Sequence, residues 1–163
     1  MLFRSGDNFG EAFGKAQLSA GTPLPDSGTV FISVNDRDKA AVVEVAAKFA
    51  EYGFQLAATR GTAAVLKAAG LSVKTVFKVN EGRPNAVDLM KASTLKLVVY
   101  TTTGGHTFKD ERDIRRTAVA YRVPCITTLS GAKAAAQAIV SRKRDPIRIW
   151  SLQEIHQSAA KAG

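Results

Sequence analysis

Hydroxyl groups, glycines and lysines gather at several points where the sequence predicts that a strand leads into a helix. Thr59, Gly61 and Thr62 form one such turn; its free amides and hydroxyls donate hydrogen bonds, and its glycine lets a ligand approach closely. Lys39 lies in the first turn of another predicted helix, where a cation opposes the helix dipole unless an anion is bound. Lys78 lies at the end of a third predicted strand. We therefore expect a phosphate-bearing ligand at these turns.

Two further predicted strands end in similar turns, at residues 100–105 and 127–131. Each turn alone has a structural explanation, because glycine and threonine are common where strands lead into helices. The polar run after residue 34 also has a structural explanation, in which Asp36 or Asp38 caps the helix and Lys39 lies in solvent. Several such turns at one sheet edge favour phosphate binding over these separate explanations.

The sequence gives little sign of catalytic chemistry. The single cysteine, Cys125, allows no internal disulfide or cysteine cluster, and the two histidines, His106 and His156, lie far apart in the chain. No triad, Walker loop or GxGxxG motif occurs. Four carboxylates could act as bases but have no identifiable partner: Asp36, Glu81, Asp88 and Asp110. We predict no catalytic residues and no metal ligands.

Hydrophobic patterning alternates between strand-like and helix-like periods. Strands are predicted at 29–34, 54–59, 73–79, 95–101 and 124–129. Helices are predicted at 39–52, 62–69, 84–92, 110–122 and 131–141. This alternation is typical of a doubly wound α/β fold, with a mainly parallel five-stranded sheet and helices on both faces. Such sheets bind ligands beyond the carboxyl ends of their strands.

We expect three segments along the chain. Residues 1–28 form an amino-terminal helical segment, with its helix at 8–18, and a linker. Residues 29–152 form the α/β domain, with an additional edge strand at 147–152. Residues 153–163 form a carboxyl-terminal tail.

Length and composition indicate one ordinary domain. The chain has 163 residues, of which 45% are hydrophobic and 23% are charged. No apolar run is long enough to span a membrane and the start lacks the pattern of a signal peptide, so we expect a soluble, cytoplasmic protein. The net charge of +9 predicts an anionic partner. Nucleic acid is disfavoured, because the basic residues are dispersed and do not alternate with aromatic ones.

The order of six segments gives a resemblance that covers nearly the whole chain. The segments are FGEAFGKAQL at 9–18, SGTVFISVNDRDK at 27–39, ATRGTAAVLKAAG at 58–70, KVNEGRP at 78–84, VVYTTTGG at 98–105 and IRRTAVAYRVPCITTLSGAKA at 114–134. Together they resemble the methylglyoxal synthase-like domain family, and more narrowly the carboxyl-terminal allosteric domain of the carbamoyl-phosphate synthase large subunit.

The resemblance implies a regulatory domain that performs no chemistry itself and binds nucleotide monophosphates, UMP or IMP. The positions that match the phosphate-binding pattern are Lys39, Thr59, Gly61, Thr62 and Lys78. Tyr100, Thr101 and Thr102 match the segment beside the ribose and base. The family commonly has asparagine where this chain has Tyr100. Some members bind ornithine through an aspartate where this chain has Ile126, so we expect no activation by ornithine.

The resemblance also implies partners outside this chain. The effector is expected to act on the remainder of the synthase large subunit, which would use ATP and magnesium, and on its glutaminase small subunit. No cofactor is expected in this domain. Carbamoyl phosphate would supply pyrimidine and arginine synthesis. Three residues are candidates for contacts between domains: Arg115, Arg116 and Thr127.

Two alternatives remain open at this stage. The first is a methylglyoxal synthase-like phosphate lyase, which is disfavoured because this chain has Asn35 where the lyases need histidine and threonines where they need an acid. The second is a basic nucleic-acid-binding domain, whose affinity would depend steeply on salt.

Overall fold

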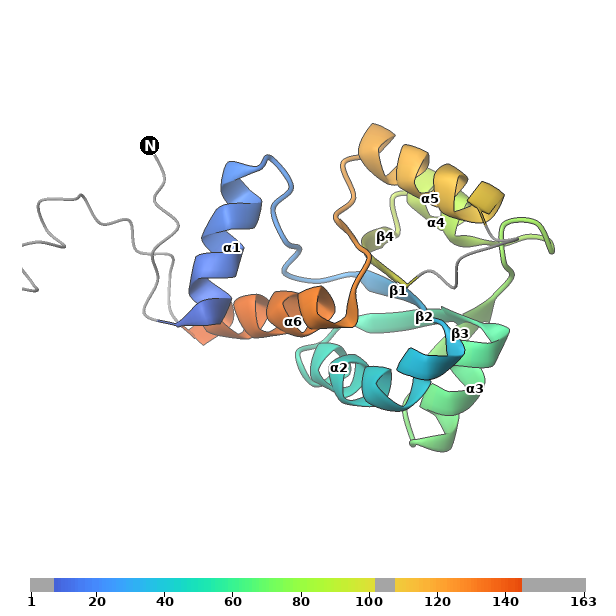
Figure 1. Ribbon diagram of the computed structural model, residues 1–163, viewed down its shortest axis with the longest axis horizontal. Coiled ribbons are helices and arrows are strands. Elements are labelled where there is room, and N and C mark those ends of the chain that lie inside the picture. Colours follow the sequence, from blue (N-terminus) through green and yellow to red (C-terminus); the bar gives the residue numbers. More distant parts are fainter. Residues whose placement is uncertain (1–7, 102–107, 145–163) are drawn as a thin grey trace, which may run out of the picture.

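The computed structural model describes residues 8–101 and 108–144, and in these residues five strands form one parallel sheet (Figure 1). The strand order is β3-β2-β1-β4-β5. The strands are β1 (Thr29–Ser33), β2 (Gln55–Thr59), β3 (Val73–Val76), β4 (Leu95–Tyr100) and β5 (Cys125–Ile126). This architecture confirms the predicted doubly wound α/β fold.

The helices form two layers over the sheet (Figure 1). One layer contains α2 (Lys39–Glu51), α3 (Arg60–Ala68) and α6 (Leu129–Arg144), and the other contains α4 (Ala86–Lys91) and α5 (Phe108–Ala120). A 3₁₀ turn at Asp36–Asp38 leads into α2, and α1 (Phe9–Ser19) packs on α6 beyond the sheet. No helix in the described residues is both long and apolar enough to cross a membrane.

Strand β1 shows why the central strands are apolar along their whole length. Val30 and Ile32 pack into the core beneath α2, α3 and α6, whereas Phe31 packs into the core beneath α4 and α5. Successive side chains on a strand point to opposite faces, so a strand covered on both faces needs a continuous apolar run. All three side chains are at most 1% exposed.

Local side-chain chemistry sets the element boundaries. Gly53 and Gly70 follow α2 and α3 with φ of +86° and +83°, the left-handed conformation that ends helices and that glycine adopts without strain. Helix α4 begins at Ala86, and not at residue 84 as predicted, because Asn85 accepts hydrogen bonds from the Val87 and Asp88 amides as its cap. Pro84 lies outside the helix, after a cis peptide bond.

All five strands are shorter in the structure than predicted, and two of them are shorter by more than one residue. Strand β3 ends at Val76, and the predicted residues 77–79 belong to a loop in which Phe77 makes one bridge to Asn85. Strand β5 ends at Ile126, because α6 starts at Leu129 and the Thr128 hydroxyl accepts a hydrogen bond from the Gly131 amide. Residue 129, which the sequence pattern assigned to the strand, is therefore the first residue of the helix.

Helix α1 packs closely on α6 through small residues. A Cβ atom at Gly10 would lie 2.8 Å from the carbonyl carbon of Gln137, so only glycine allows this approach. Lys15 is 2% exposed and pairs with Glu11 at 2.6 Å. The amino-terminal segment is therefore packed against the α/β domain. The predicted strand at 147–152 and the tail at 153–163 lie outside the described residues.

Candidate functional site

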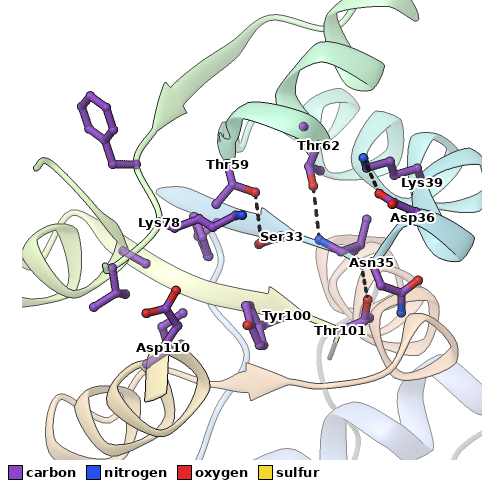
Figure 2. A pocket seen from close by; sticks show the side chains of 17 residues that line it. Ser33, Asn35, Asp36, Lys39, Thr59, Thr62, Lys78, Tyr100, Thr101 and Asp110 are labelled. Carbon is purple, nitrogen blue, oxygen red and sulfur yellow. Dashed lines mark hydrogen bonds and ion pairs between the residues drawn. The ribbon is translucent and has the colours of Figure 1, made fainter. Parts of the chain in front are cut away.

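A pocket of about 270 Å³ lies at the carboxyl ends of β1, β2 and β4 (Figure 2). The chain builds the sheet from β1 toward β3 and then returns to place β4 on the other side of β1. The pocket thus lies where the direction of strand addition reverses, the usual position of ligands in open α/β sheets. Its lining includes seven of the eight residues predicted from the sequence for phosphate, ribose and base: Lys39, Thr59, Gly61, Thr62, Lys78, Tyr100 and Thr101.

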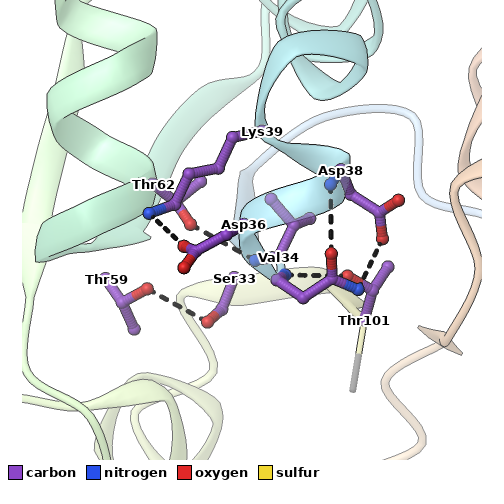
Figure 3. Close-up of polar contacts among 9 residues, drawn as sticks. Ser33, Val34, Asp36, Asp38, Lys39, Thr59, Thr62 and Thr101 are labelled. Carbon is purple, nitrogen blue, oxygen red and sulfur yellow. Dashed lines mark hydrogen bonds and ion pairs between the residues drawn. The ribbon is translucent and has the colours of Figure 1, made fainter. Parts of the chain in front are cut away.

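Hydroxyl groups connect the three strand ends at the base of the pocket (Figure 3). Ser33 and Thr59 pair through their hydroxyls at 3.0 Å, and the Val34 amide donates to the Thr62 hydroxyl at 3.2 Å. The Asn35 amide donates to the Thr101 hydroxyl at 3.0 Å. A hydroxyl that accepts one hydrogen bond keeps its proton for another. Thr62 and Thr101 therefore each keep a hydroxyl proton that they can donate to a ligand.

Lys39 lies close to the start of α3. Its Nζ is 2.6 Å from the Asp36 carboxylate and would be 3.1 Å from a Cβ at position 61. Gly61 therefore leaves the space that the ammonium occupies. Within the described residues, Thr59 at the helix N-cap makes no side-chain capping bond, so the first amides of α3 face this region without a capping group.

The helix cap at this turn differs from the prediction. The Asn35 side chain accepts a hydrogen bond from the Asp38 amide at 3.0 Å and donates one to the Asp38 carboxylate at 2.9 Å. Neither Asp36 nor Asp38 provides the cap. An asparagine accepts and donates through one amide group, so it caps the turn and leaves the Asp36 carboxylate to pair with Lys39.

The opposite end of the pocket contains a buried carboxylate. Asp110 is 6% exposed, and its Oδ1 atom has no hydrogen-bond partner among the described residues. Burial raises the pKa of Asp110, while the charge of Lys78 and a hydrogen bond from the Asn80 backbone lower it. Buried carboxylates with a raised pKa inside a pocket are common at functional sites. The sequence offered Asp110 as one of four possible bases but did not single it out, because an acid in the first turn of a helix is explained by the helix dipole alone.

Apolar side chains surround this acidic end. Phe31, Tyr100 and Ile114 line the pocket and are at most 8% exposed, and Figure 2 shows Asp110 and Tyr100 on the side of α5 and β4. The pocket therefore joins a cationic, hydroxyl-lined end to an apolar end with one acceptor. Lys78 lies between them and pairs with Glu81 at 3.2 Å.

Other predicted residues lie elsewhere. Thr102 and His106 are outside the described residues. Arg115 and Arg116 are exposed on the outer surface of α5, where Arg115 pairs with Glu111. Thr127 is exposed after β5. Cys125 is half-buried, and burial raises the pKa of its thiol.

The outer surface of α5 also carries an unpredicted feature. A groove of about 460 Å³ is lined by Glu111, Arg112, Arg115, Arg116 and Val119. Val119 is 80% exposed, which is unusual for a large apolar side chain on a helix. Ile114 on the same helix lines the pocket, so α5 connects the two surfaces.

The chain is similar in sequence to large chains of carbamoyl phosphate synthase. The chain is 54% identical over 154 residues to the carbamoyl phosphate synthase large chain of Acidobacterium capsulatum, covering 94% of this chain and 14% of that protein. It is 46% identical over 150 residues to the carbamoyl phosphate synthase large chain, C-terminal section, of Methanopyrus kandleri, covering 91% and 28%. The chain thus spans a small part of the curated relatives.

A solved structure and a family model identify the fold and the family. Methylglyoxal synthase from Elizabethkingia anophelis superposes with a TM-score of 0.57 at 18% identity, covering 69% of this chain and 79% of that one, which shows a shared fold. The model of the MGS-like domain matches residues 41–127, more than half of the chain. The chain therefore belongs to the MGS-like domain family.

Proposed function

We propose that this chain is an allosteric domain of a carbamoyl-phosphate synthase large subunit and that it binds a nucleoside monophosphate, UMP or IMP. The observation that carries the proposal is the pocket at the reversal point of the sheet, where two lysines and a set of hydroxyls meet. The identity to large-chain relatives over more than 90% of this chain supports the parent protein.

The two ends of the pocket match the two ends of a nucleotide. The phosphate lies near Lys39, Thr59, Gly61 and Thr62, where the ammonium, hydroxyl protons and first amides of α3 converge. The sugar lies toward Asp110, where the carboxylate oxygen that has no partner among residues 8–101 and 108–144 accepts hydrogen bonds from a hydroxyl. Tyr100 and Ile114 cover the apolar parts of the ligand.

The rest of the parent protein supplies the chemistry. Synthesis of carbamoyl phosphate needs ATP and magnesium in the remainder of the large subunit, and the glutaminase small subunit supplies ammonia. The product serves pyrimidine and arginine synthesis in the cytoplasm. A rice relative, 45% identical over 151 residues, is an arginine-specific large chain.

Regulation requires that the effector bind two states of the synthase with different affinity, because equal binding shifts no equilibrium. Helix α5 contacts the pocket through Asp110 and Ile114 and presents Arg115 and Arg116 outward. Arginine forms bidentate ion pairs well suited to an interface. We assign these arginines and Thr127 to the contact with the synthetase region.

A calorimetric titration of the 163-residue chain tests the binding step. UMP or IMP should bind more tightly than inorganic phosphate, because the sugar and base add contacts at the Asp110 end. Uridine, which lacks the phosphate, is the matched control and should bind at least tenfold more weakly than UMP. Equal affinity for uridine and UMP, or no binding of either nucleotide, would contradict the proposal.

The second candidate is a lyase that acts on a triose phosphate. It is favoured by Asp110, a buried carboxylate with a raised pKa beside Lys78, which is suited to removing a proton. Asn35 occupies the position where the lyases need histidine, so we expect no lyase activity. Methylglyoxal production from dihydroxyacetone phosphate that follows the purified protein and is lost in Asp110→Asn would establish the lyase instead.

A further inference from the structure

Each lysine of the pocket pairs with a carboxylate three residues away in its own loop. Lys39 Nζ lies 2.6 Å from Asp36, as the dashed line in Figure 3 shows, and Lys78 Nζ lies 3.2 Å from Glu81. The two pairs come from different loops, after β1 and after β3. Both ammonium groups proposed to bind phosphate are therefore already partnered by carboxylates of the protein.

The Asp36 carboxylate depends mainly on Lys39 for its position. Its side chain is 91% exposed, whereas Lys39 is 29% exposed, and both residues line the pocket. The pKa of Asp36 is lowered by its hydrogen bond to Lys39 and then by the charge of that lysine, so the carboxylate is anionic at neutral pH. It sits on the ammonium that a phosphate oxygen would contact.

We propose that Asp36, and Glu81 to a smaller extent, are internal competitors of the effector phosphate, which must displace them from Lys39 and Lys78. This inference rests on the proposed function, since it concerns the same pocket. A carboxylate tethered three residues away competes at a high effective concentration. A free monoanion offers the lysine no more charge than Asp36 does.

The competition lowers the apparent affinity of every anion that must displace the same carboxylate, and by one common factor. It therefore sets how tightly the pocket binds and not which anion it prefers. A phosphate monoester carries a charge of about −1.5 to −2 at pH 7, more than a singly charged carboxylate, so it can still displace Asp36 from Lys39.

Titration of the Asp36→Asn chain with UMP tests the proposal. Removing the competitor should tighten binding about two- to fivefold, a modest effect because exposed ion pairs are weak. Glu51→Gln is the control, since it removes the same charge from an exposed residue at the other end of α2 and should leave affinity unchanged. Glu81→Gln should tighten binding less than Asp36→Asn, because its pair is longer.

Two further measurements isolate the mechanism. In a Lys39→Met background, Asp36→Asn should have no effect, because the ammonium that Asp36 occupies is gone. Methyl phosphate, used as a competitor of UMP, needs the same ammonium, so Asp36→Asn should tighten its binding by the same factor as that of UMP.

The outcomes separate this inference from the proposed function. If wild type binds UMP but Asp36→Asn binds no more tightly than Glu51→Gln, or if the gain persists in the Lys39→Met background, the competition is wrong and the nucleotide site stands. If neither wild type nor Asp36→Asn binds UMP, the proposed function fails and the competition fails with it.

Discussion

The two ends of the pocket differ in how completely the protein satisfies its own polar groups. At the Lys39 end, Ser33, Thr59, Thr62 and Thr101 hold one another or the adjacent amides, and the lysine pairs with Asp36. At the other end, Asp110 is almost fully buried and one carboxylate oxygen has no partner in the described residues.

The two ends therefore contribute to binding in different ways: one holds its donors in place, and the other contains a buried carboxylate that we expect to be unfavourable for stability. The Lys39 end holds its donors in place before a ligand arrives, so little further ordering is needed on binding. At the Asp110 end, burial disfavours the charged carboxylate, and we expect this to lower stability at neutral pH. A group that costs stability and lines a pocket is expected to be retained for binding or catalysis.

The largest expected effect comes from removing a cation. Lys39→Met or Lys78→Met should weaken UMP binding at least tenfold, because a cation about 4 Å from a phosphate charge contributes about 4 kcal/mol at an effective dielectric near about 20, before desolvation and screening. Lys133→Met is the control, since Lys133 is exposed and pairs with Glu44 on the surface. Unchanged affinity in both pocket variants would remove the proposed phosphate site.

Asp110→Asn should affect nucleotides and not phosphate. UMP affinity should fall about fivefold, because the ligand loses a hydrogen bond to a charged acceptor that contributes about 1 kcal/mol. Affinity for inorganic phosphate should stay the same. Calorimetry with both ligands measures the contrast. An equal loss for the two ligands would show that the pocket ends are not distinct.

The same variant should be more stable near neutral pH. Because burial raises the pKa of Asp110 in the folded state, the folded chain binds this proton more tightly than the unfolded chain. Stability therefore falls as pH rises from the ordinary Asp value through the raised one. Thermal unfolding should give Asp110→Asn a higher Tm than wild type at pH 7, with the gap closing below about pH 3.5. A gap that is constant with pH would indicate a packing effect.

Gly61→Ala should have two smaller effects of opposite sign: weaker nucleotide binding and higher stability. The new Cβ would lie 3.1 Å from Lys39 Nζ, and the flexible lysine would move to relieve the contact. Nucleotide affinity should fall about two- to threefold, while stability rises by up to about 1 kcal/mol because alanine favours the helix over glycine. Thermal unfolding and UMP titration of one preparation measure both. A loss of stability would show that the start of α3 has no room for a side chain.

The outer arginines should have no effect on binding to the isolated chain. Arg115→Ala and Arg116→Ala lie outside the pocket, so UMP affinity should stay within error of wild type. In the full synthase the same variants should reduce the nucleotide effect on the rate, since coupling of about 1–3 kcal/mol must pass through an interface. A full response in both variants, or weaker UMP binding to the isolated chain, would show that this assignment is wrong.

Much of the fold was predictable because its signals are local. Continuous apolar runs identified the central strands, and the predicted helix ends at 52 and 69 lie within one residue of the ends of α2 and α3. Boundaries failed where two local signals competed. At residues 127–129 a β-branched run continued the strand pattern, but the Thr128 cap started α6. At residue 84 a proline favoured a helix start, but the Asn85 cap set it two residues later.

The site divides in the same way. The sequence by itself determined the chemistry of the Lys39 end, because threonine, glycine and lysine at strand ends meet at one edge of any parallel sheet. Only the tertiary structure decided that Asp110 joins them, since its position depends on how α5 packs over β4. It also decided that Asp36 pairs with Lys39 while Asn35 caps the turn. Burial, hydrogen-bond partners and the pairing of one ammonium depend on distances in the packed structure. The spacing of residues along the chain does not predict these distances.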